Sequence, residues 1–375
     1  MKKLGFGFMR LPMPDPKEQG RVDFDQVCRM VDTFLAHGFT YFDTAYMYHE
    51  YQSECVLRRA LVERHPRGSF TVATKLPVMA LKDAAQQERV FTEQLQKCGV
   101  DYFDYYLLHN LNVSNYETAK RLDSFAFLSE KKAQGRARRI GFSFHDRAQL
   151  LDEILTAHPE VDFVQLQINY LDWENESIQS RRCYEVACRH DKPVIVMEPV
   201  KGGTLAHVPE GIRSLFSAAR PDLSPPAWAI RFAASLDNVL VVLSGMSDLA
   251  QMEDNISFME DFSPMTARER IVVERAAELL RGGGAVPCTA CRYCVEGCPK
   301  HIPIPEYFAL LNAERQEIEK DFSVQGVYYA NLAAAGGRAS DCIGCGKCER
   351  ACPQHIEVPR FLKDVAAAFE KEGGN

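Results

Sequence analysis

Two cysteine runs near the end of the sequence constrain this chain more than any other feature. Both runs have the spacing C-x2-C-x2-C-x3-C and are followed directly by proline; they comprise Cys288, Cys291, Cys294 and Cys298, then Cys342, Cys345, Cys348 and Cys352. Proteins use this spacing to hold [4Fe–4S] cubes in pairs, because three close thiolates wrap one cube while the fourth reaches the other. The sequence therefore predicts two [4Fe–4S] clusters with crossed ligation. Cys352 completes the site of the first run, and Cys298 completes the site of the second.

The repeat extends beyond the cysteines. CPKHIPIP (298–305) and CPQHIEVP (352–359) share Cys, Pro, His, Ile and the last Pro at a constant offset of 54 residues. Two copies of one supersecondary unit explain this agreement. Zinc is the alternative, since it also binds C-x2-C pairs, but it has no need of the C-x3-C-P ending. Iron–sulfur clusters are therefore favoured, and neither His301 nor His355 is needed as a ligand.

The composition excludes some classes of function. The chain has 375 residues, 46% hydrophobic and 25% charged, which is typical of a globular protein with one large and one small domain. Its net charge of −7 gives no sign of binding to nucleic acid or to an anionic membrane surface. We expect no signal peptide and no membrane-spanning segment, because the apolar stretches are short. A cytoplasmic protein with reduced thiols is expected.

Residues 1–262 alternate strand-like and helix-like segments. The expected strands are Lys3–Phe8, Thr40–Thr44, Phe70–Lys75, Tyr102–His109, Arg139–Ser143, Phe163–Ile168, Pro193–Met197 and Val239–Leu243. The expected helices are Asp25–His37, Gln52–Arg64, Gln86–Cys98, Ala119–Gln134, Ala148–Ala157, Ile178–His190, Ala227–Leu236 and Leu249–Met259. Eight strand–helix pairs predict an α/β fold, a (β/α)8 TIM barrel. A doubly wound sheet is disfavoured, because no G-x-G-x-x-G follows the first strand.

The remainder of the chain is expected to form a connector and a small ferredoxin-like iron–sulfur domain. Residues 263–284 are predicted to form a helical connector ending in three glycines, and residues 285–375 are predicted to form the cluster domain with a C-terminal helix. Within it, Glu306–Lys320 is expected to be helical, Ala330–Ala339 a loop and Arg360–Lys371 the last helix. Because the connector is short, we expect the tail to pack on the barrel, at the carboxyl ends of the strands.

Four polar residues stand at or just after the ends of successive strands. Asp43 ends the second strand, Tyr48 follows five residues later, Lys75 ends the third strand and His109 ends the fourth. Each has an ordinary explanation on its own, such as a helix cap, a packed aromatic or a structural histidine. Active sites of (β/α)8 barrels lie at the carboxyl ends of the strands, so the joint placement points to catalysis.

At these residues the chain resembles the aldo/keto reductase family. The resemblance covers residues 1–262 and is carried by L-G-F-G-F-M-R-L-P at the start, D-x4-Y, the lysine and L-L-H. The tail resembles the subgroup with a fused C-terminal ferredoxin domain that holds two [4Fe–4S] clusters. The resemblance implies that Tyr48 is the general acid, that Asp43 fixes Lys75 and that His109 orients the carbonyl oxygen. A nearby lysine cation would lower the pKa of the Tyr48 phenol, which is ordinarily near 10.

The family's contacts to nicotinamide are only partly matched. Ser143 and Gln165 match, whereas Phe144 replaces an asparagine and no stacking aromatic follows the seventh strand. Asn255 matches the adenine-side asparagine. Gly202 and Gly203 could approach a phosphate, or could simply form a tight turn.

The segment after the eighth strand bears on the choice of coenzyme. Residues 244–255 contain no lysine or arginine where the family grips the 2′-phosphate of NADP, and four acids lie within 248–260. The phosphate would be unpaired there, so NADH is favoured over NADPH. FMN is a further candidate, since a flavin converts two-electron into one-electron transfer and barrels bind flavin phosphate without a sharp motif.

Two readings of function follow. In the first, the chain is an oxidoreductase that interconverts a small-molecule carbonyl and alcohol, and its clusters pass single electrons to or from a ferredoxin or flavodoxin. In the second, the chain is an electron-transfer or binding module whose barrel has lost nicotinamide-dependent activity. The intact set of Asp43, Tyr48, Lys75 and His109 favours the first reading.

Overall fold

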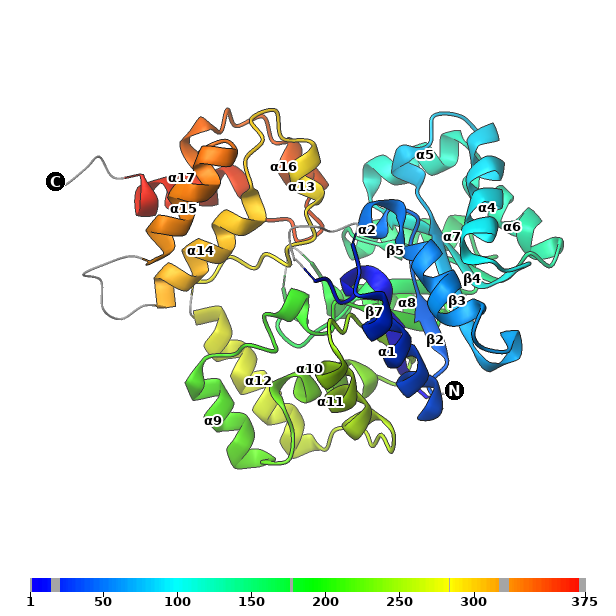
Figure 1. Ribbon diagram of the computed structural model, residues 1–375, viewed down its shortest axis with the longest axis horizontal. Coiled ribbons are helices and arrows are strands. Elements are labelled where there is room, and N and C mark those ends of the chain that lie inside the picture. The colour runs from blue at the N-terminus through cyan, green and yellow to red at the C-terminus, as the bar shows by residue number, and fades with distance from the viewer. Residues whose placement is uncertain (1, 15–20, 176–177, 283, 317–323, 371–375) are drawn as a thin grey trace. The chain divides into compact units, whose positions relative to one another are not determined.

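The computed structural model describes residues 2–14, 21–175, 178–282, 284–316 and 324–370 (Figure 1). The chain divides into two compact units. The barrel unit comprises Met1–Val200 and Leu205–Glu274, and the cysteine-rich unit comprises Lys201–Thr204 and Arg275–Asn375. The division falls inside one helix, α12 (Ala267–Gly282), which lies within the expected connector.

Eight parallel strands form a closed barrel in the order of the sequence, as predicted. Their bounds are Leu4–Gly7 (β1), Tyr41–Asp43 (β2), Thr71–Leu76 (β3), Phe103–Leu111 (β4), Ala137–Phe144 (β5), Phe163–Gln167 (β6), Val194–Met197 (β7) and Val239–Ser244 (β8). β1 pairs with both β2 and β8, which closes the barrel. All eight carboxyl ends therefore meet at one face, where the loops that follow them carry side chains from distant parts of the sequence.

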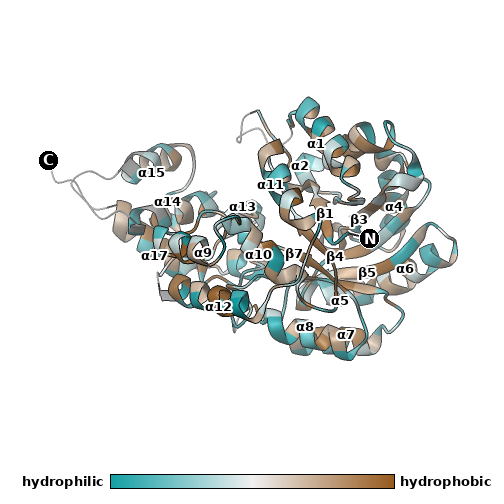
Figure 2. Ribbon diagram, turned by 90° about the horizontal axis from the view of Figure 1, so that it is seen from below, coloured by the Kyte–Doolittle hydropathy of each residue, from teal (hydrophilic) through white to brown (hydrophobic). Residues whose placement is uncertain are grey.

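Helices cover the outside of the barrel. Their bounds are Phe24–Ala36 (α1), Tyr48–Tyr51 (α2), Ser53–Leu57 (α3), Ala85–Cys98 (α4), Val113–Arg121 (α5), Ser124–Ala133 (α6), Ala148–Ala157 (α7), Ser180–Arg189 (α8), Glu210–Ala219 (α9), Pro225–Ala234 (α10) and Leu249–Met259 (α11). Figure 2 shows hydrophobic and hydrophilic residues alternating along α7 and α8, as amphipathic helices require. Among the described residues, no helix is both long and apolar enough to cross a membrane.

The two faces of the strands build two separate cores. Alternate residues point into the barrel, where Tyr41, Tyr105, Phe163 and Val241 belong to one buried cluster. The intervening residues point outwards and join the buried faces of the helices in a larger cluster. Because apolar side chains fill both faces of the strands, the polar side chains available for catalysis lie near the strand ends.

Three expectations about the barrel helices need correction. The expected helix Ala119–Gln134 is two helices, α5 and α6, because Asp123 between them adopts a left-handed φ of 55°. The expected helix Gln52–Arg64 is the short α3 followed by the wider π-helical turn Arg58–Val62. α9 was not expected, although its buried Ile212 and Phe216 have helical spacing.

The cysteine-rich unit repeats one backbone motif. Its helices are Tyr293–Glu296 (α13), Ile304–Gln316 (α14), Val324–Ala335 (α15), Lys347–Ala351 (α16) and Val358–Phe369 (α17), coloured yellow to red in Figure 1. α14 and α17 begin 54 residues apart, the offset of the sequence repeat. His301 and His355 both adopt a left-handed φ, of 51° and 49°. The agreement supports two copies of one supersecondary unit.

One expectation for this unit is wrong. Ala330–Ala339 was expected to be a loop, but most of it belongs to α15, because alanine is the best helix former and the glycines come only after Ala335. α14 and α17 match the other two expected helices. The predicted ends at Lys320 and Lys371, together with Gly283 of the glycine triplet, lie outside the described residues.

Candidate active site and cluster sites

A buried ion pair joins the ends of two neighbouring strands. β2 and β3 run in parallel register with Asp43 opposite Ala73, so Lys75 lies two residues farther along β3, toward the same end of the barrel. The Lys75 Nζ donates to Asp43 Oδ1 at 2.6 Å and to the Thr44 carbonyl oxygen at 2.7 Å. Burial lowers the pKa of Lys75 and raises that of Asp43, and the attraction between the two charges opposes both shifts. Two short hydrogen bonds hold the ammonium in one place.

Tyr48 and His109 complete the predicted group. The Lys75 Nζ lies 5.0 Å from the centroid of the Tyr48 ring. The His109 ring packs edge-on against Tyr48, with 6.0 Å between the ring centroids. The structure therefore brings Asp43, Tyr48, Lys75 and His109 together in one place, from the end of β2 and the segment that follows it, from β3 and from β4.

The expected effect of Lys75 on Tyr48 is not found. Burial raises the pKa of Tyr48 well above its ordinary value, the charges of Asp43 and Glu198 raise it further, and only Arg10 opposes them. The physical reason is that Asp43 lies against Lys75 and compensates its charge. Tyr48 therefore keeps its proton across the neutral range, which suits a proton donor.

His109 is neutral in this setting. Burial lowers its pKa well below the ordinary value, and the charges of Lys75 and His145 add to the shift. Its Nδ1 is buried without a hydrogen-bond partner among the described residues. A neutral imidazole carries one N–H, which can donate to a carbonyl oxygen without competing with Tyr48 for the proton.

The buried carboxyl group of Glu54 is linked to the backbone of Lys75 through hydrogen bonds. Glu54 of α3 accepts hydrogen bonds on Oε1 from Thr74 Oγ1 and Gln94 Nε2, both at 2.7 Å. The same Gln94 Nε2 donates to the Lys75 carbonyl oxygen at 2.9 Å. Burial raises the pKa of Glu54 to about 7, and the charge of Glu54 in turn raises the pKa of Lys75.

Glu54 should make the stability of the barrel depend on pH. Its pKa of about 7 in the folded chain lies above the unfolded value near 4.5, so between these values the folded state binds the extra proton and stability falls as pH rises. From pH 4.5 to pH 8 the loss is about 3 kcal/mol. Urea unfolding followed by tryptophan fluorescence measures it, since Trp173 and Trp228 both lie in the barrel unit. Glu54→Gln should remove this pH dependence, whereas the exposed Glu63→Gln should retain it. Equal slopes in wild type and Glu54→Gln would refute this assignment.

The residues matched to nicotinamide lie at the ends of the later strands. Ser143 Oγ accepts a hydrogen bond from the Asn110 backbone N–H at 2.8 Å and so also fixes the chain after His109. Gln165 Nε2 lies 3.7 Å from Met197 Sδ, while Gln165 Oε1 is buried without a partner among the described residues. That orphaned oxygen fits an incoming carboxamide N–H.

Other matched residues are engaged elsewhere. Asn255 Nδ2 donates to Ser244 Oγ at 2.8 Å, which ties α11 to the end of β8. Gly202 and Gly203 have φ of 62° and 100°, and a Cβ at Gly202 would come within 2.6 Å of the Thr289 carbonyl oxygen. Both glycines group with the cysteine-rich unit, where they form a tight turn. Their role toward a phosphate stays a prediction.

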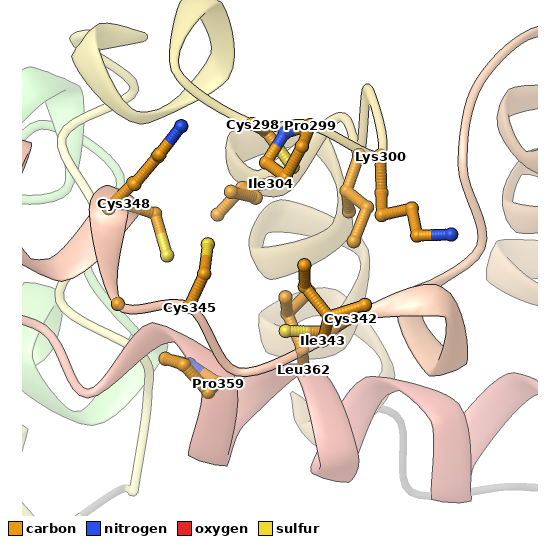
Figure 3. Close-up of a pocket in the computed structure, with 13 residues that line it drawn as sticks. Cys298, Pro299, Lys300, Ile304, Cys342, Ile343, Cys345, Cys348, Pro359 and Leu362 are labelled. Carbon is orange, nitrogen blue, oxygen red and sulfur yellow. The ribbon is translucent and has the colours of Figure 1, made fainter.

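The second cysteine run and Cys298 surround one cavity. It is lined by all four of Cys298, Cys342, Cys345 and Cys348. Figure 3 shows their sulfur atoms turned toward a common space, with Ile304 and Leu362 on its walls. This is the grouping that crossed ligation requires.

The first run and Cys352 surround the other cavity. It is lined by all four of Cys288, Cys291, Cys294 and Cys352. Among the described residues, no three cysteine, histidine or acidic side chains are close enough together to hold a single metal ion. Four sulfurs spread around a cavity fit a four-iron cube better than one tetrahedral zinc.

Sequence reasoning missed three charged residues of the barrel site. Arg10 follows β1 and Glu198 follows β7, and their side chains lie 3.9 Å apart. Both stand just beyond strand ends, so the rule that found Lys75 could have found them. Glu54 lies inside a helical segment, and nothing in its sequence context shows that it is buried.

Comparison with known proteins agrees with both units. The pattern of the aldo/keto reductase family matches residues 3–269, and that of a 4Fe-4S dicluster domain matches residues 287–356. An NADH-specific methylglyoxal reductase of Escherichia coli is 25% identical over 281 residues, covering 62% of this chain and 82% of its own. An aldo-keto reductase of Mycolicibacterium vanbaalenii is 29% identical over 269 residues, covering 69% and 83%.

Solved structures show the same fold. A Bacillus halodurans aldo-keto reductase in holo form has a TM-score of 0.57 at 23% identity, covering 73% of this chain and 91% of its own. A Klebsiella pneumoniae aldo-keto reductase in complex with NADPH has a TM-score of 0.56 at 19% identity, covering 73% and 90%. The family pattern spans most of the chain and coincides with the barrel and its strand-end residues. The chain is therefore a member of the aldo/keto reductase family, an oxidoreductase that carries a 4Fe-4S dicluster domain.

Proposed function

We propose that the barrel reduces a small-molecule carbonyl to an alcohol with NADH and that Tyr48 donates the proton. The observation that carries this is the buried Asp43–Lys75 pair beside a protonated Tyr48 and a neutral His109. When bound, a nicotinamide supplies the hydride that adds to the carbonyl carbon. Tyr48 Oη gives its proton to the carbonyl oxygen, so the product is an alcohol with no charge left on it. Run backwards, the same groups oxidise an alcohol.

The other residues orient the substrate and stabilise charge. The N–H of neutral His109 can hold the carbonyl oxygen beside Tyr48. Once Tyr48 has lost its proton, Lys75 is the nearest cation of the group, and Asp43 keeps it in place. The orphaned Gln165 Oε1 and the Ser143 hydroxyl would hold the carboxamide of the coenzyme.

The two cysteine runs would hold the two [4Fe–4S] clusters, which exchange electrons one at a time. Burial raises the pKa of both Cys288 and Cys348 to about 11. At neutral pH these thiols lose their protons only when metal binds. Cluster assembly should therefore release protons and become weaker in acid.

The charges near α11 favour NADH over NADPH. Asp248 caps this helix, accepting from the Gln251 backbone N–H at 2.8 Å, and Asp254 accepts from Ser224 Oγ at 2.7 Å. No basic side chain stands in residues 244–255 to pair with a 2′-phosphate. The relative described as NADH-specific is consistent with this preference.

Coenzyme binding and turnover test the proposal together. Fluorescence titration of the anaerobic protein should give a Kd for NADH at least tenfold below that for NADPH, because residues 244–255 supply acids and no lysine or arginine to the 2′-phosphate. With methylglyoxal as the carbonyl, NADH should be consumed and an alcohol formed in equal amounts. Asp248→Asn should narrow the gap between the coenzymes, whereas Asp123→Asn, remote in sequence from α11, should not. Tighter binding of NADPH, or no binding of either coenzyme, would contradict the proposal.

One observation favours a second candidate function. Phe144 takes the place of the family's asparagine, and it is buried at 2% exposure. Without the asparagine amide to bind nicotinamide, the barrel would belong to a flavin-linked reductase or to a binding module for electron transfer. The origin of the hydrogen in the product separates these functions.

A further inference from the structure

The two cluster sites differ in their exposure. Each site holds one cysteine that is only 8% exposed, Cys294 in the first and Cys348 in the second, but in the first site the neighbouring Thr289 and Gln354 are buried as well, at 2% and 5% exposure. In the second site, Cys345 is exposed and Ile343 beside it is 63% exposed. A cluster held by the second run would therefore lie close to solvent. It is the better placed of the two to receive an electron from another protein.

Cations surround this exposed cluster site. Lys300 and Lys347 line its cavity and are both exposed, and neither forms an ion pair within the described part of the chain. The Arg350 guanidinium lies 3.5 Å from the Cys345 carbonyl oxygen. The acids nearest in sequence are Glu349 on the same turn and the exposed Asp341 beside Cys342, so three cations stand against two carboxylates. The excess stands out because the whole chain carries a net charge of −7.

We call Lys300, Ile343, Cys345, Lys347 and Arg350 the outer patch. An exposed isoleucine alone is ordinary, but here it lies beside a cluster ligand and among unpaired cations. Weak electron-transfer complexes bury small surfaces, below roughly 1,200 Å² in total, so docking of such a carrier does not require a large apolar face. Opposite charges bring such partners together and set their orientation.

We propose that the outer patch is the docking site of an acidic one-electron carrier protein of the ferredoxin or flavodoxin class. The inference rests on the proposed function only in requiring that the second run and Cys298 hold a [4Fe–4S] cluster. One electron passes from the reduced carrier to the oxidised cluster, so the carrier is oxidised by one electron and the cluster is reduced by one. No other reactant is needed, and no proton is transferred.

Stopped-flow mixing with a fully reduced acidic flavodoxin tests the patch. The absorbance of the cluster and that of the one-electron-oxidised flavodoxin report the transfer directly. In the wild type the second-order rate should fall steeply as salt is raised from 20 mM to 500 mM, because salt screens the attraction. Dithionite, a small reductant that needs no docking, should reduce the same cluster in every variant.

Paired substitutions identify the residues. Lys300→Gln with Lys347→Gln should slow reduction by flavodoxin about tenfold or more at low salt, with little difference left at high salt. The control pair is Lys363→Gln with Arg281→Gln, which removes the same charge from exposed positions of the same unit that do not line the cavity. Iron content is measured for each protein, and the salt dependence of the wild type tests the proposal even if a variant does not assemble.

Three results would overturn the proposal. The first is a wild-type rate that does not depend on salt. The second is an equal loss of rate in the two pairs of variants. The third is a concentration-dependent dimer that only the Lys300–Lys347 pair abolishes, which would show that a second copy covers the patch. The assay contains no nicotinamide and no carbonyl, so failure of the proposed barrel reaction leaves its outcome unchanged.

Discussion

Tyr48→Phe is expected to slow NADH-dependent carbonyl reduction roughly 100- to 10,000-fold, the usual contribution of a positioned general acid. The substitution removes only the hydroxyl that donates the proton. The ring still packs on His109 and under Lys75, so the site keeps its shape. The Kd for NADH should therefore stay within about twofold, because Gln165 and Ser143 are untouched. Steady-state kinetics and coenzyme titration on one preparation measure both quantities.

Tyr46→Phe is the matched control. Tyr46 stands two residues away, and its hydroxyl donates to Glu93 at 3.0 Å on the exposed side of the barrel. Tyr46→Phe removes the same hydroxyl group as Tyr48→Phe and leaves Asp43 and Lys75 unchanged. We expect its turnover to remain within about twofold of wild type. A Tyr48→Phe enzyme with wild-type turnover would remove Tyr48 from the mechanism.

Cys298→Ala is expected to damage the cluster of the second run rather than that of its own run. Cys298 lines the same cavity as Cys342, Cys345 and Cys348. The intact protein should contain about eight irons and eight acid-labile sulfides. The variant should lose up to half of both, and Cys28→Ala, which is outside both runs, should lose none. Iron and sulfide analysis of anaerobically purified protein is the measurement.

Double substitutions decide which cysteines share a cluster. Cys298→Ala combined with Cys345→Ala should lose no more iron than the worse of the two single variants, because both ligate one cube. Cys298→Ala combined with Cys291→Ala should damage both cubes. The reverse pattern would show that ligation is not crossed.

The barrel and its four central residues could be predicted because their signals are local. Each strand is a short apolar run, and that run alone places the end of the strand to within a few residues. Asp43 is the last residue of β2, whereas β3 continues to Leu76 and β4 to Leu111, so Lys75 and His109 lie just before the ends of their strands rather than on them. Parallel pairing then brings the ends together, so a one-dimensional pattern was enough to predict a three-dimensional group.

Other features depend on contacts that no local pattern contains. The raised pKa of Tyr48 results from burial and from the charges of Asp43 and Glu198, which are known only once the chain has folded. Glu54 lies in a short helix, and its carboxyl group is buried where Thr74 and Gln94 donate hydrogen bonds to it. Sequence reasoning expected Asp43 to pair with Lys75, but it did not follow that this pairing compensates the lysine charge that was expected to lower the pKa of Tyr48.

In the cysteine-rich unit, some features could be predicted from the sequence and others could not. The offset of 54 residues predicted two copies of one motif, and the left-handed positions agree between them. Gly344 and Gly346 adopt φ of 65° and 68° in the second copy. Ala290 and Arg292 adopt φ of 53° and 66° at the same positions in the first, where no glycine marks the turn. A left-handed alanine or arginine is strained, and only the repeat could have indicated it.

Transfer of label from NADH carrying deuterium at C4 tests the central claim most directly. The anaerobic protein is mixed with this NADH and methylglyoxal, and the alcohol is analysed by mass spectrometry. Direct hydride transfer beside Tyr48 predicts one deuterium per alcohol on the former carbonyl carbon, with one NADH consumed. An alcohol without deuterium would contradict it, because a flavin or the clusters would supply electrons while the hydrogen came from solvent.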